Sequence, residues 1–363
     1  MSRKIRVGIT HGDINGIGYE VILKVLEDNR ILEICTPVVY GSAKLAANYR
    51  KMLGLGNIPF NQIESAADAR DDANNIVNVV GEELRAEPGT SSAEAGQAAF
   101  MALERAVSDL KDGEIDVLVT APINKANIQS ENFTFPGHTE YLEAALGEDD
   151  EDNALMILCN DTMRVALVTA HLPIAQVPSA ITKESILEKL EIFNHSLQRD
   201  FAVVKPRIAV LSLNPHAGEN GLLGSEEADV IAPAIAEARD NKILAFGPYA
   251  PDGFFGSGAF KKFDGILAMY HDQGLAPFKT LSMDNGVNFT AGLPYVRTSP
   301  DHGTGYDIAG KGEASEASMR EAIYQAIDIF RNRHTYDEAH RSPLRRLYHE
   351  KGSDNVVLDL TSE

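Results

Sequence analysis

The 363-residue sequence is poor in cysteine, contains no tryptophan and has far fewer basic than acidic residues. Its two cysteines, Cys35 and Cys159, are too few for a disulfide framework or for a zinc site built from thiolates. The 33 Lys and Arg against 53 Asp and Glu give a net charge of −20, which disfavours nucleic acid and anionic membranes as partners. An anionic substrate therefore requires a local cluster of basic residues.

Long apolar runs are also missing from the sequence. No run reaches the roughly 20 residues that a membrane helix needs, and the first residues lack the apolar core of a secretion signal. We therefore expect a cytoplasmic protein. With 44% hydrophobic residues, a chain of this length has the composition of a globular protein with two domains.

Short β-branched segments alternate with longer amphipathic segments, and this alternation predicts an α/β fold. The expected strands comprise residues 5–10, 37–40, 115–120, 165–170, 208–213 and 265–270. The expected helices comprise residues 19–28, a helix opened by a capping box of Ser91 with Glu94, a helix capped by Thr182, and residues 316–331. The residues that follow these strands are candidates for function, because α/β sheets bind ligands at the carboxyl ends of strands.

Three histidines each follow an apolar strand: His171, His216 and His271, which lie 45 and 55 residues apart. These spacings match successive strand–helix repeats, so the imidazoles can converge. Neutral imidazole is a common ligand of divalent metals, and three leave positions open for substrate or water. We interpret them as metal ligands, although any one alone is more often a hydrogen-bonded loop or core histidine. Asp272 is a partner that orients an imidazole, a further ligand or a turn residue.

A second set of residues suits anion binding: His138, Thr139, Lys279, Asn288 and Arg297. The first two begin an expected helix, whose backbone N–H groups and Thr139 hydroxyl can bind phosphate. Alternatively, Thr139 is a plain helix N-cap. The other three follow His271 in a Gly-rich segment, where Lys and Arg suit phosphate or carboxylate. Their grouping distinguishes them from ordinary surface charges.

The Gly-rich segment 12–18 fails the test for a dinucleotide-binding turn. Its glycines lack the G-x-G-x-x-G spacing, and the second strand ends without an acidic residue for a ribose. No Walker A pattern occurs in the sequence. We expect a tight turn that approaches a substrate or the other domain.

Seven segments of the sequence, which contain the candidate site residues discussed above, resemble the PdxA family of 4-hydroxythreonine-4-phosphate dehydrogenases. The matching segments lie between residues 12 and 312: GDINGIGYE, APINKANI, GHTEYL, TAHLP, NPHAGENGLLGSEE, YHDQGLAPFK and GVNFTAGLPYVRTSPDHGTGYDIAGKG. The resemblance implies the two-domain α/β fold of the isocitrate and isopropylmalate dehydrogenases, which bind NAD without an ordinary Rossmann domain. We then expect one domain from residues 1–127 with 303–363, a second from 128–302, and an active site in the cleft between them.

The resemblance also implies roles for individual residues. One divalent metal (Zn, Co, Mg or Mn) is expected on His171, His216 and His271, and the substrate on the anion-binding set named above. NAD, or NADP, is expected beside His302, Gly303, Thr304 and Asp307. Family members are homodimers with the active site at the subunit interface and one metal ligand crossing over, and the sequence does not indicate which ligand crosses.

The implied reaction is NAD-dependent oxidation of 4-phosphooxy-L-threonine at C3, followed by decarboxylation to 3-amino-2-oxopropyl phosphate, in pyridoxal phosphate biosynthesis. Lys279 or Asp272 is expected to relay the proton. An alternative with the same fold and cofactor is oxidation of D-threonate or D-erythronate 4-phosphate in sugar-acid catabolism. Alternatives of other classes are a metal-dependent phosphotransferase or hydrolase and a non-enzymatic metal-binding protein.

The sequence departs from the family pattern in two places. Where many members have a GDPAGIGPE-like segment, this chain has Ile14, Asn15 and Tyr19, and loss of the prolines changes the local backbone stiffness. The acidic run at residues 148–152 resembles an insertion. We interpret it as a solvated surface loop, because it lacks the spaced ligands of a calcium loop.

Overall fold

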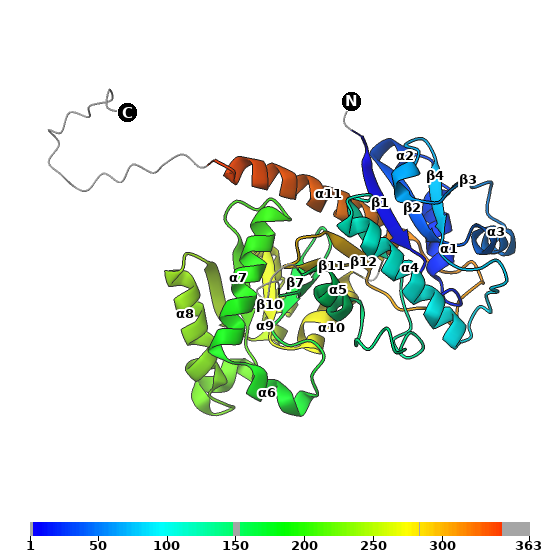
Figure 1. Cartoon of the computed structure of the whole chain (residues 1–363). Coiled ribbons are helices and arrows are strands. Elements are labelled where there is room, and N and C mark those ends of the chain that lie inside the picture. The colour runs from blue at the N-terminus through cyan, green and yellow to red at the C-terminus, as the bar shows by residue number, and fades with distance from the viewer. Residues whose placement is uncertain (1–2, 148–152, 283, 343–363) are drawn as a thin grey trace, which may run out of the picture.

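The computed structural model describes residues 3–147, 153–282 and 284–342, so the acidic run 148–152 lies outside the described residues. These residues form an α/β fold with one sheet of twelve strands, and helices pack on both of its faces (Figure 1). Across the sheet, the strands are β3 (Phe60–Ile63), β4 (Asn74–Asn78), β2 (Cys35–Gly41), β1 (Ile5–Thr10), β5 (Val117–Thr120), β12 (Arg297–Pro300), β11 (Val287–Ala291), β6 (Leu155–Cys159), β7 (Arg164–Leu167), β10 (Gly265–Ala268), β8 (Arg207–Leu211) and β9 (Leu244–Tyr249). The predicted α/β class is confirmed.

The two ends of the sheet run in opposite directions. Strands β3, β4, β2, β1, β5 and β12 pair in parallel, as do β7, β10, β8 and β9. Between them, β12, β11, β6 and β7 pair antiparallel. This order is not that of a Rossmann domain, as expected from the missing glycine fingerprint. The expected domain division falls between the neighbouring strands β5 and β12, and it stays a prediction.

The helices are α1 (Gly18–Leu26), α2 (Ile31–Ile34), α3 (Ala43–Met52), α4 (Ala93–Lys111), α5 (His138–Leu146), α6 (Val177–Ala180), α7 (Lys183–Arg199), α8 (Ala232–Asp240), α9 (Pro251–Gly256), α10 (His271–Leu281) and α11 (Ala317–His340), with short turns η1 (Ala66–Asp68), η2 (Ile174–Gln176), η3 (Pro215–Gly221), η4 (Glu227–Ile231) and η5 (Ala259–Lys262). Adjacent residues of β2, Val39 and Tyr40, belong to different apolar clusters. Side chains alternate across a strand, so these clusters lie on opposite faces of the sheet. Among the described residues, none of the helices combines the length and apolar character needed to cross a bilayer.

The apolar stripe predicted for α4 is confirmed, because its residues are all buried: Ala95, Ala98, Ala102, Ala106 and Leu110. The predicted capping box of Ser91 with Glu94 is wrong. Ser92 is the N-cap, and its hydroxyl accepts a hydrogen bond from the Ala95 N–H. Ser91 instead accepts from Asn124 at 3.2 Å. The predicted Thr182 cap of α7 is confirmed.

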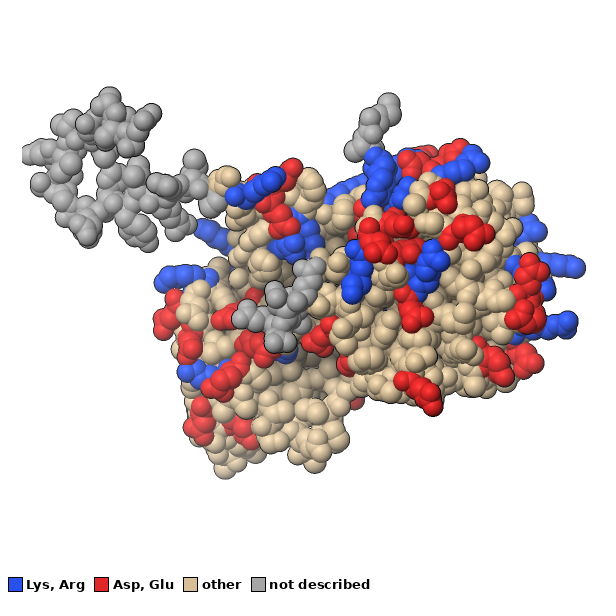
Figure 2. Space-filling view, in the orientation of Figure 1, with Lys and Arg blue, Asp and Glu red and all other residues tan. Residues whose placement is uncertain are grey.

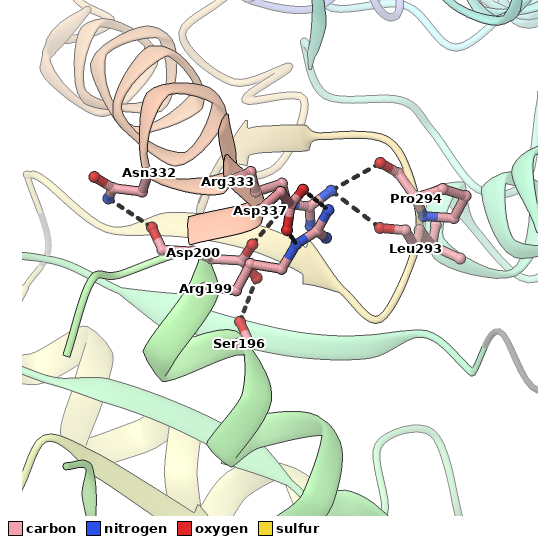
Figure 3. Close-up of polar contacts among 8 residues, drawn as sticks. All are labelled: Ser196, Arg199, Asp200, Leu293, Pro294, Asn332, Arg333 and Asp337. Atoms are coloured by element: carbon pink, nitrogen blue, oxygen red, sulfur yellow. Dashed lines mark hydrogen bonds and ion pairs between the residues drawn. The ribbon is translucent and has the colours of Figure 1, made fainter. Parts of the chain in front are cut away.

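A buried ion pair connects α11 to the end of α7 (Figure 3). Arg333 Nε donates to Asp200 Oδ1 at 2.6 Å, and the side chains are 7% and 3% exposed. The Arg333 guanidinium also donates to the carbonyls of Leu293 and Pro294, in the turn between β11 and β12. Ser196 donates its hydroxyl proton to the other Asp200 oxygen at 2.6 Å. These contacts fix α11 across the antiparallel centre of the sheet.

We expect Arg333→Leu to lower the free energy of unfolding by about 3–5 kcal/mol, because it leaves the Asp200 carboxylate buried without its cation. Urea denaturation monitored by circular dichroism measures this change. Arg199→Leu is the matched control, since the neighbouring Arg199–Asp337 pair is partly exposed and its loss should cost less than about 1 kcal/mol. Equal losses in both variants would contradict this account of the buried pair.

Candidate active site

A cavity of about 330 Å³ lies where the two parallel parts of the sheet approach each other. Its lining comes from the end of β5, the start of α5, strands β6, β11 and β12, the last turn of α10, and the loops after β7 and β12. The whole anion-binding set predicted from the sequence lines it: His138, Thr139, Lys279, Asn288 and Arg297. The fold therefore brings these distant residues to one place.

The basic residues of the cavity contrast with the acidic character of the chain, whose net charge is −20. On the face shown in Figure 2, acidic side chains are spread over both ends of the molecule, with a compact group on its right half. The cavity lining contains Lys125, Lys279 and Arg297 together with the carboxylates of Glu140 and Asp301. This is the local cluster of basic residues that an anionic ligand requires.

Arg297 is a buried cation whose protein partners are hydroxyl groups. The residue is 2% exposed; its Nη2 donates to Thr120 Oγ1 at 2.6 Å and its Nη1 to Thr290 Oγ1 at 3.2 Å. Burial lowers the pKa of the guanidinium to about 9, an effect that the charge of Glu140 opposes. Because a buried charge is costly unless an opposite charge pairs with it, this environment favours an anionic ligand beside Arg297.

The start of α5 presents a second feature suited to an anion. The N-cap is Gly137, without a side-chain cap, so the alternative interpretation of Thr139 as a plain N-cap is wrong. The uncapped N–H groups of a first helical turn bind anions well. Burial, together with the charges of Arg297 and Lys125, lowers the pKa of His138 well below its usual range, so the ring is neutral. Within the described part of the chain, the buried His138 Nε2 has no hydrogen-bond partner.

Lys279 contributes its amine from the last turn of α10, and its Nζ lies 3.2 Å from Asp301 Oδ1. Burial raises the pKa of the Asp301 carboxyl, and the neighbouring Lys279 opposes that rise. Elsewhere in the lining, Asn288 Oδ1 is buried and has no hydrogen-bond partner among the residues that the structure describes. Unpaired buried polar atoms are rare in folded proteins, so Asn288 Oδ1 is a further position for a ligand group.

His171 and His271 lie side by side, with their ring centroids 6.1 Å apart. The Nδ1 atom of His171 lies 3.4 Å from Glu140 Oε1, and the Nδ1 atom of His271 lies 2.7 Å from Asp272 Oδ1. A carboxylate on one ring nitrogen is the usual way to orient an imidazole whose other nitrogen binds a metal. In both rings a carboxylate therefore lies beside Nδ1, which leaves Nε2 as the nitrogen available to a ligand.

His216 does not join this pair within one chain. The described residues contain no group of three or more His, Cys, Asp or Glu suited to a metal ion. His216 lies in η3, where it has a φ of 52° and is followed by Ala217, Glu219 and Asn220, which also have positive φ. Such left-handed backbone costs roughly 1–2 kcal/mol per residue, and backbone strain of this kind is concentrated at functional sites.

The expected cofactor segment follows β12 and borders the same cavity. His302 and Gly303 line the cavity, whereas Thr304 and Asp307 lie outside its lining. His302 Nδ1 lies 3.1 Å from the Gly303 carbonyl, and its buried Nε2 has no partner in residues 3–147, 153–282 and 284–342. Burial lowers the pKa of this imidazole. A neutral ring with one unpaired nitrogen can bind a polar group of a ligand.

Five polar or charged residues of the cavity lining were not among the site residues predicted from the sequence: Thr120, Lys125, Glu140, Ser299 and Asp301. Thr120 ends the expected strand 115–120, and this position at the carboxyl end of a strand could have identified it as a candidate site residue. Lys125 and Glu140 lie within segments that carry the family resemblance. Asp301 follows β12, a strand that the sequence pattern did not predict.

The fold and the cavity define an α/β protein with a cavity whose basic residues suit a small anionic ligand, and comparison with known proteins identifies its family. Residues 33–326 match the family model "Pyridoxal phosphate biosynthetic protein PdxA". A 4-hydroxythreonine-4-phosphate dehydrogenase of Bacteroides thetaiotaomicron is 56% identical over 362 residues, 99% of each chain. The chain belongs to the PdxA family, which confirms the resemblance drawn from the sequence.

More distant relatives that are also named 4-hydroxythreonine-4-phosphate dehydrogenase agree with this membership. An enzyme of Sulfurihydrogenibium sp. is 41% identical over 329 residues, which cover 91% of this chain and 99% of that protein. The crystal structure of the Klebsiella pneumoniae enzyme matches with a TM-score of 0.77 at 34% identity, covering 91% of this chain and 100% of the other. The fold described above is therefore the fold of solved family members.

Replacing Arg297 by Met tests whether the cavity is an anion site. Inorganic phosphate should stabilise the unchanged protein, by about 2.7 kcal/mol at 100 times its Kd. The variant should lose this gain, while its stability without phosphate stays the same or rises, because a costly buried charge is removed. Unfolding temperatures over a phosphate series give the result. The control is Arg70→Met, which removes an exposed arginine paired with Asp72 and should keep the full stabilisation by phosphate. If Arg297→Met also kept this stabilisation, the assignment of an anion site would be contradicted.

Proposed function

We propose that the protein is an NAD- and metal-dependent dehydrogenase that oxidises 4-phosphooxy-L-threonine at C3 and decarboxylates the product to 3-amino-2-oxopropyl phosphate, in pyridoxal phosphate biosynthesis. The observation that carries the proposal is Arg297, a buried cation whose hydrogen-bond partners among the described residues are hydroxyl groups, in a cavity of about 330 Å³. The name of the Bacteroides thetaiotaomicron relative, at 56% identity, supports this choice of reaction.

In this proposal, the phosphate binds at the start of α5. The N–H groups of His138 and Thr139 and the Arg297 guanidinium supply its hydrogen bonds. The neutral His138 ring contributes a hydrogen bond rather than a charge. Asn288 offers its unpaired amide oxygen to a donor on the substrate. Holding the phosphate in this way orients C3 for reaction, which is a large part of catalysis in such enzymes.

Lys279 is the better candidate for the proton relay. Its amine lines the cavity and contacts Asp301, so a proton can pass between the substrate and this pair. Asp272 lies outside the cavity lining, its side chain is 84% exposed, and it contacts His271. We therefore assign Asp272 to orienting that imidazole and Lys279 to moving the proton of the substrate hydroxyl.

The residues after β12 fit a dinucleotide. His302 has a buried, unpaired Nε2, and Gly303 beside it leaves open space where a side chain would stand. We assign NAD, with NADP as the alternative, to His302, Gly303, Thr304 and Asp307. The chemistry that NAD supplies is acceptance of the hydride from C3.

The donor set of His171 and His271 fits a divalent metal, since two neighbouring imidazoles have carboxylates on Nδ1. The chemistry a metal supplies there is polarisation of the substrate hydroxyl and stabilisation of negative charge during decarboxylation. We propose that the third ligand is His216 of a second subunit in a homodimer, because one chain leaves it outside the pair. Exposed apolar side chains beside these histidines support a subunit contact: Leu172, Ile174, Leu222 and Leu223.

The proposed reaction suits the cytoplasm. Both cysteines are free and buried, Cys35 and Cys159, and a pair of free thiols agrees with a reducing compartment. Nothing in this proposal requires a nucleic acid or a membrane as partner, in line with the strongly acidic composition.

The proposal is tested by following NADH formation at 340 nm with three substrates in parallel: 4-phosphooxy-L-threonine, D-threonate 4-phosphate and D-erythronate 4-phosphate. We expect turnover of the threonine derivative, lost on chelation and restored by a divalent metal. Preference for either sugar-acid phosphate would instead assign the enzyme to sugar-acid catabolism. Absence of turnover with all three, from folded protein, would contradict a dehydrogenase of this class and favour a phosphotransferase or hydrolase.

Hybrid dimers test the assignment of His216 to the second subunit. His171→Ala and His216→Ala subunits, co-expressed with different affinity tags, form a hybrid with one undamaged site if His216 crosses between subunits. Such a hybrid should bind about half the metal of the unchanged dimer, measured by mass spectrometry of the purified protein. If all three ligands came from one chain, both sites would be damaged and the hybrid would bind as little metal as either variant dimer.

A further inference from the structure

The Gly-rich turn after β1, residues 12–18, is buried although none of its residues lines the cavity. Asp13, within it, is 0% exposed. Its Oδ1 accepts a hydrogen bond from the Asn15 N–H at 2.8 Å, and its Oδ2 accepts from Asn127 Nδ2 and from the Tyr306 hydroxyl, each at 2.7 Å. All three donors are neutral. A carboxylate buried among neutral donors depends on each of them, because every lost donor leaves charge unsatisfied.

Tyr306 lies in the segment 301–312, which follows β12 and contains the residues assigned to the cofactor. Its hydroxyl donates to Asp13 and accepts from Asn124 Nδ2 at 3.0 Å. Burial and the hydrogen bond to Asp13 raise the pKa of Tyr306, so the hydroxyl keeps its proton and remains a donor. One side chain of the segment is thus connected both to the β1 turn and to the residues after β5.

The backbone of the turn also contacts this segment. The Ile17 N–H donates to the Thr304 carbonyl at 2.9 Å. A Cβ atom at Gly16 would lie 2.7 Å from the same carbonyl oxygen, so only glycine permits this approach. The glycines therefore serve a close contact with residues 301–312. The turn is tight, as predicted, but Thr304 belongs to the same expected domain, so this contact is neither with a substrate nor with the other domain.

Asn15 fixes the other side of the turn. Its Oδ1 accepts from the Glu87 N–H at 2.6 Å, and its Nδ2 donates to the Thr90 carbonyl at 2.8 Å. This residue is one of the departures from the family pattern noted in the sequence. The family pattern has alanine at this position, so the two hydrogen bonds from Asn15 to the 87–90 segment are contacts that an alanine side chain could not make.

We propose that Asp13 and Tyr306 are positioning residues for the dinucleotide: the hydrogen bond from the Tyr306 hydroxyl to Asp13 holds residues 301–312 in the conformation that binds the cofactor. The inference rests on the proposed function, which assigns the cofactor to this segment. Neither residue lines the cavity, and the proposed phosphate site at the start of α5 and Arg297 lies outside the segment 301–312, so their loss should affect dinucleotide binding and leave the phosphate site unchanged.

The test is Tyr306→Phe, which removes the hydroxyl and little else. We expect the Kd and KM for NAD to rise about tenfold, as for the loss of one hydrogen bond to a charged group. The KM for the phosphorylated substrate and the stabilisation by inorganic phosphate should stay unchanged. Tyr324→Phe, on the exposed side of α11, is the matched control and should leave all four quantities unchanged.

Amide hydrogen exchange of residues 301–312, measured without cofactor, gives a readout that does not depend on catalysis. Exchange should be faster in Tyr306→Phe and in Asp13→Asn, and the double variant should be no faster than the quicker single variant. Unchanged NAD affinity in Tyr306→Phe, or an equal loss of affinity for NAD and substrate, would overturn the inference. If the unchanged protein bound no dinucleotide, the proposed function and the cofactor role of this contact would both fail, whereas the exchange data would still report whether Asp13 holds the segment.

Discussion

The parallel pairing of β12 with β5 is the contact on which the candidate site depends. Arg297 lies opposite Leu118 and Thr298 opposite Val119 in this pairing. It joins the strands of the N-terminal part of the chain, β1 to β5, to the strands that follow residue 150, and it sets the Arg297 guanidinium against the Thr120 hydroxyl. Because β12 lies beside β5 while the chain between them forms β6 to β11, the cavity at this junction collects residues from Thr120 to Gly303.

Two buried arginines show how the same residue type serves different purposes. The charge of Arg333 is paired with Asp200, and its guanidinium also donates to carbonyls of the β11–β12 turn, so this arginine stabilises the packing of α11. Arg297 is buried to a similar degree but has hydroxyl partners. Its charge remains available to a ligand, at a cost in stability that an anion would offset. The chain thus keeps an uncompensated cation where its acidic composition would otherwise repel an anionic ligand.

Much of the fold could be predicted from local patterns. The strand 5–10, the buried stripe of α4 and the Thr182 cap are properties of short segments, and the structure confirms them. The hairpin of β11 and β12 could not be predicted, because its segments are short and its partners β5 and β6 lie far away in the sequence. The residues of the anion-binding set could be predicted from the chemistry of their side chains. Their assembly around one cavity depends on that hairpin.

The sequence by itself determined the α/β class, the family, and the residue types that a phosphorylated substrate and a metal need, because periodicity, motifs and side-chain chemistry are local properties. Only the tertiary structure decided which of these groups are paired. It sets His171 beside His271 and leaves His216 apart, and it gives the Gly-rich turn its contact with Thr304 and Tyr306. Burial and pairing of charges arise from segments that meet across the fold, and no local pattern in the sequence records which segments meet.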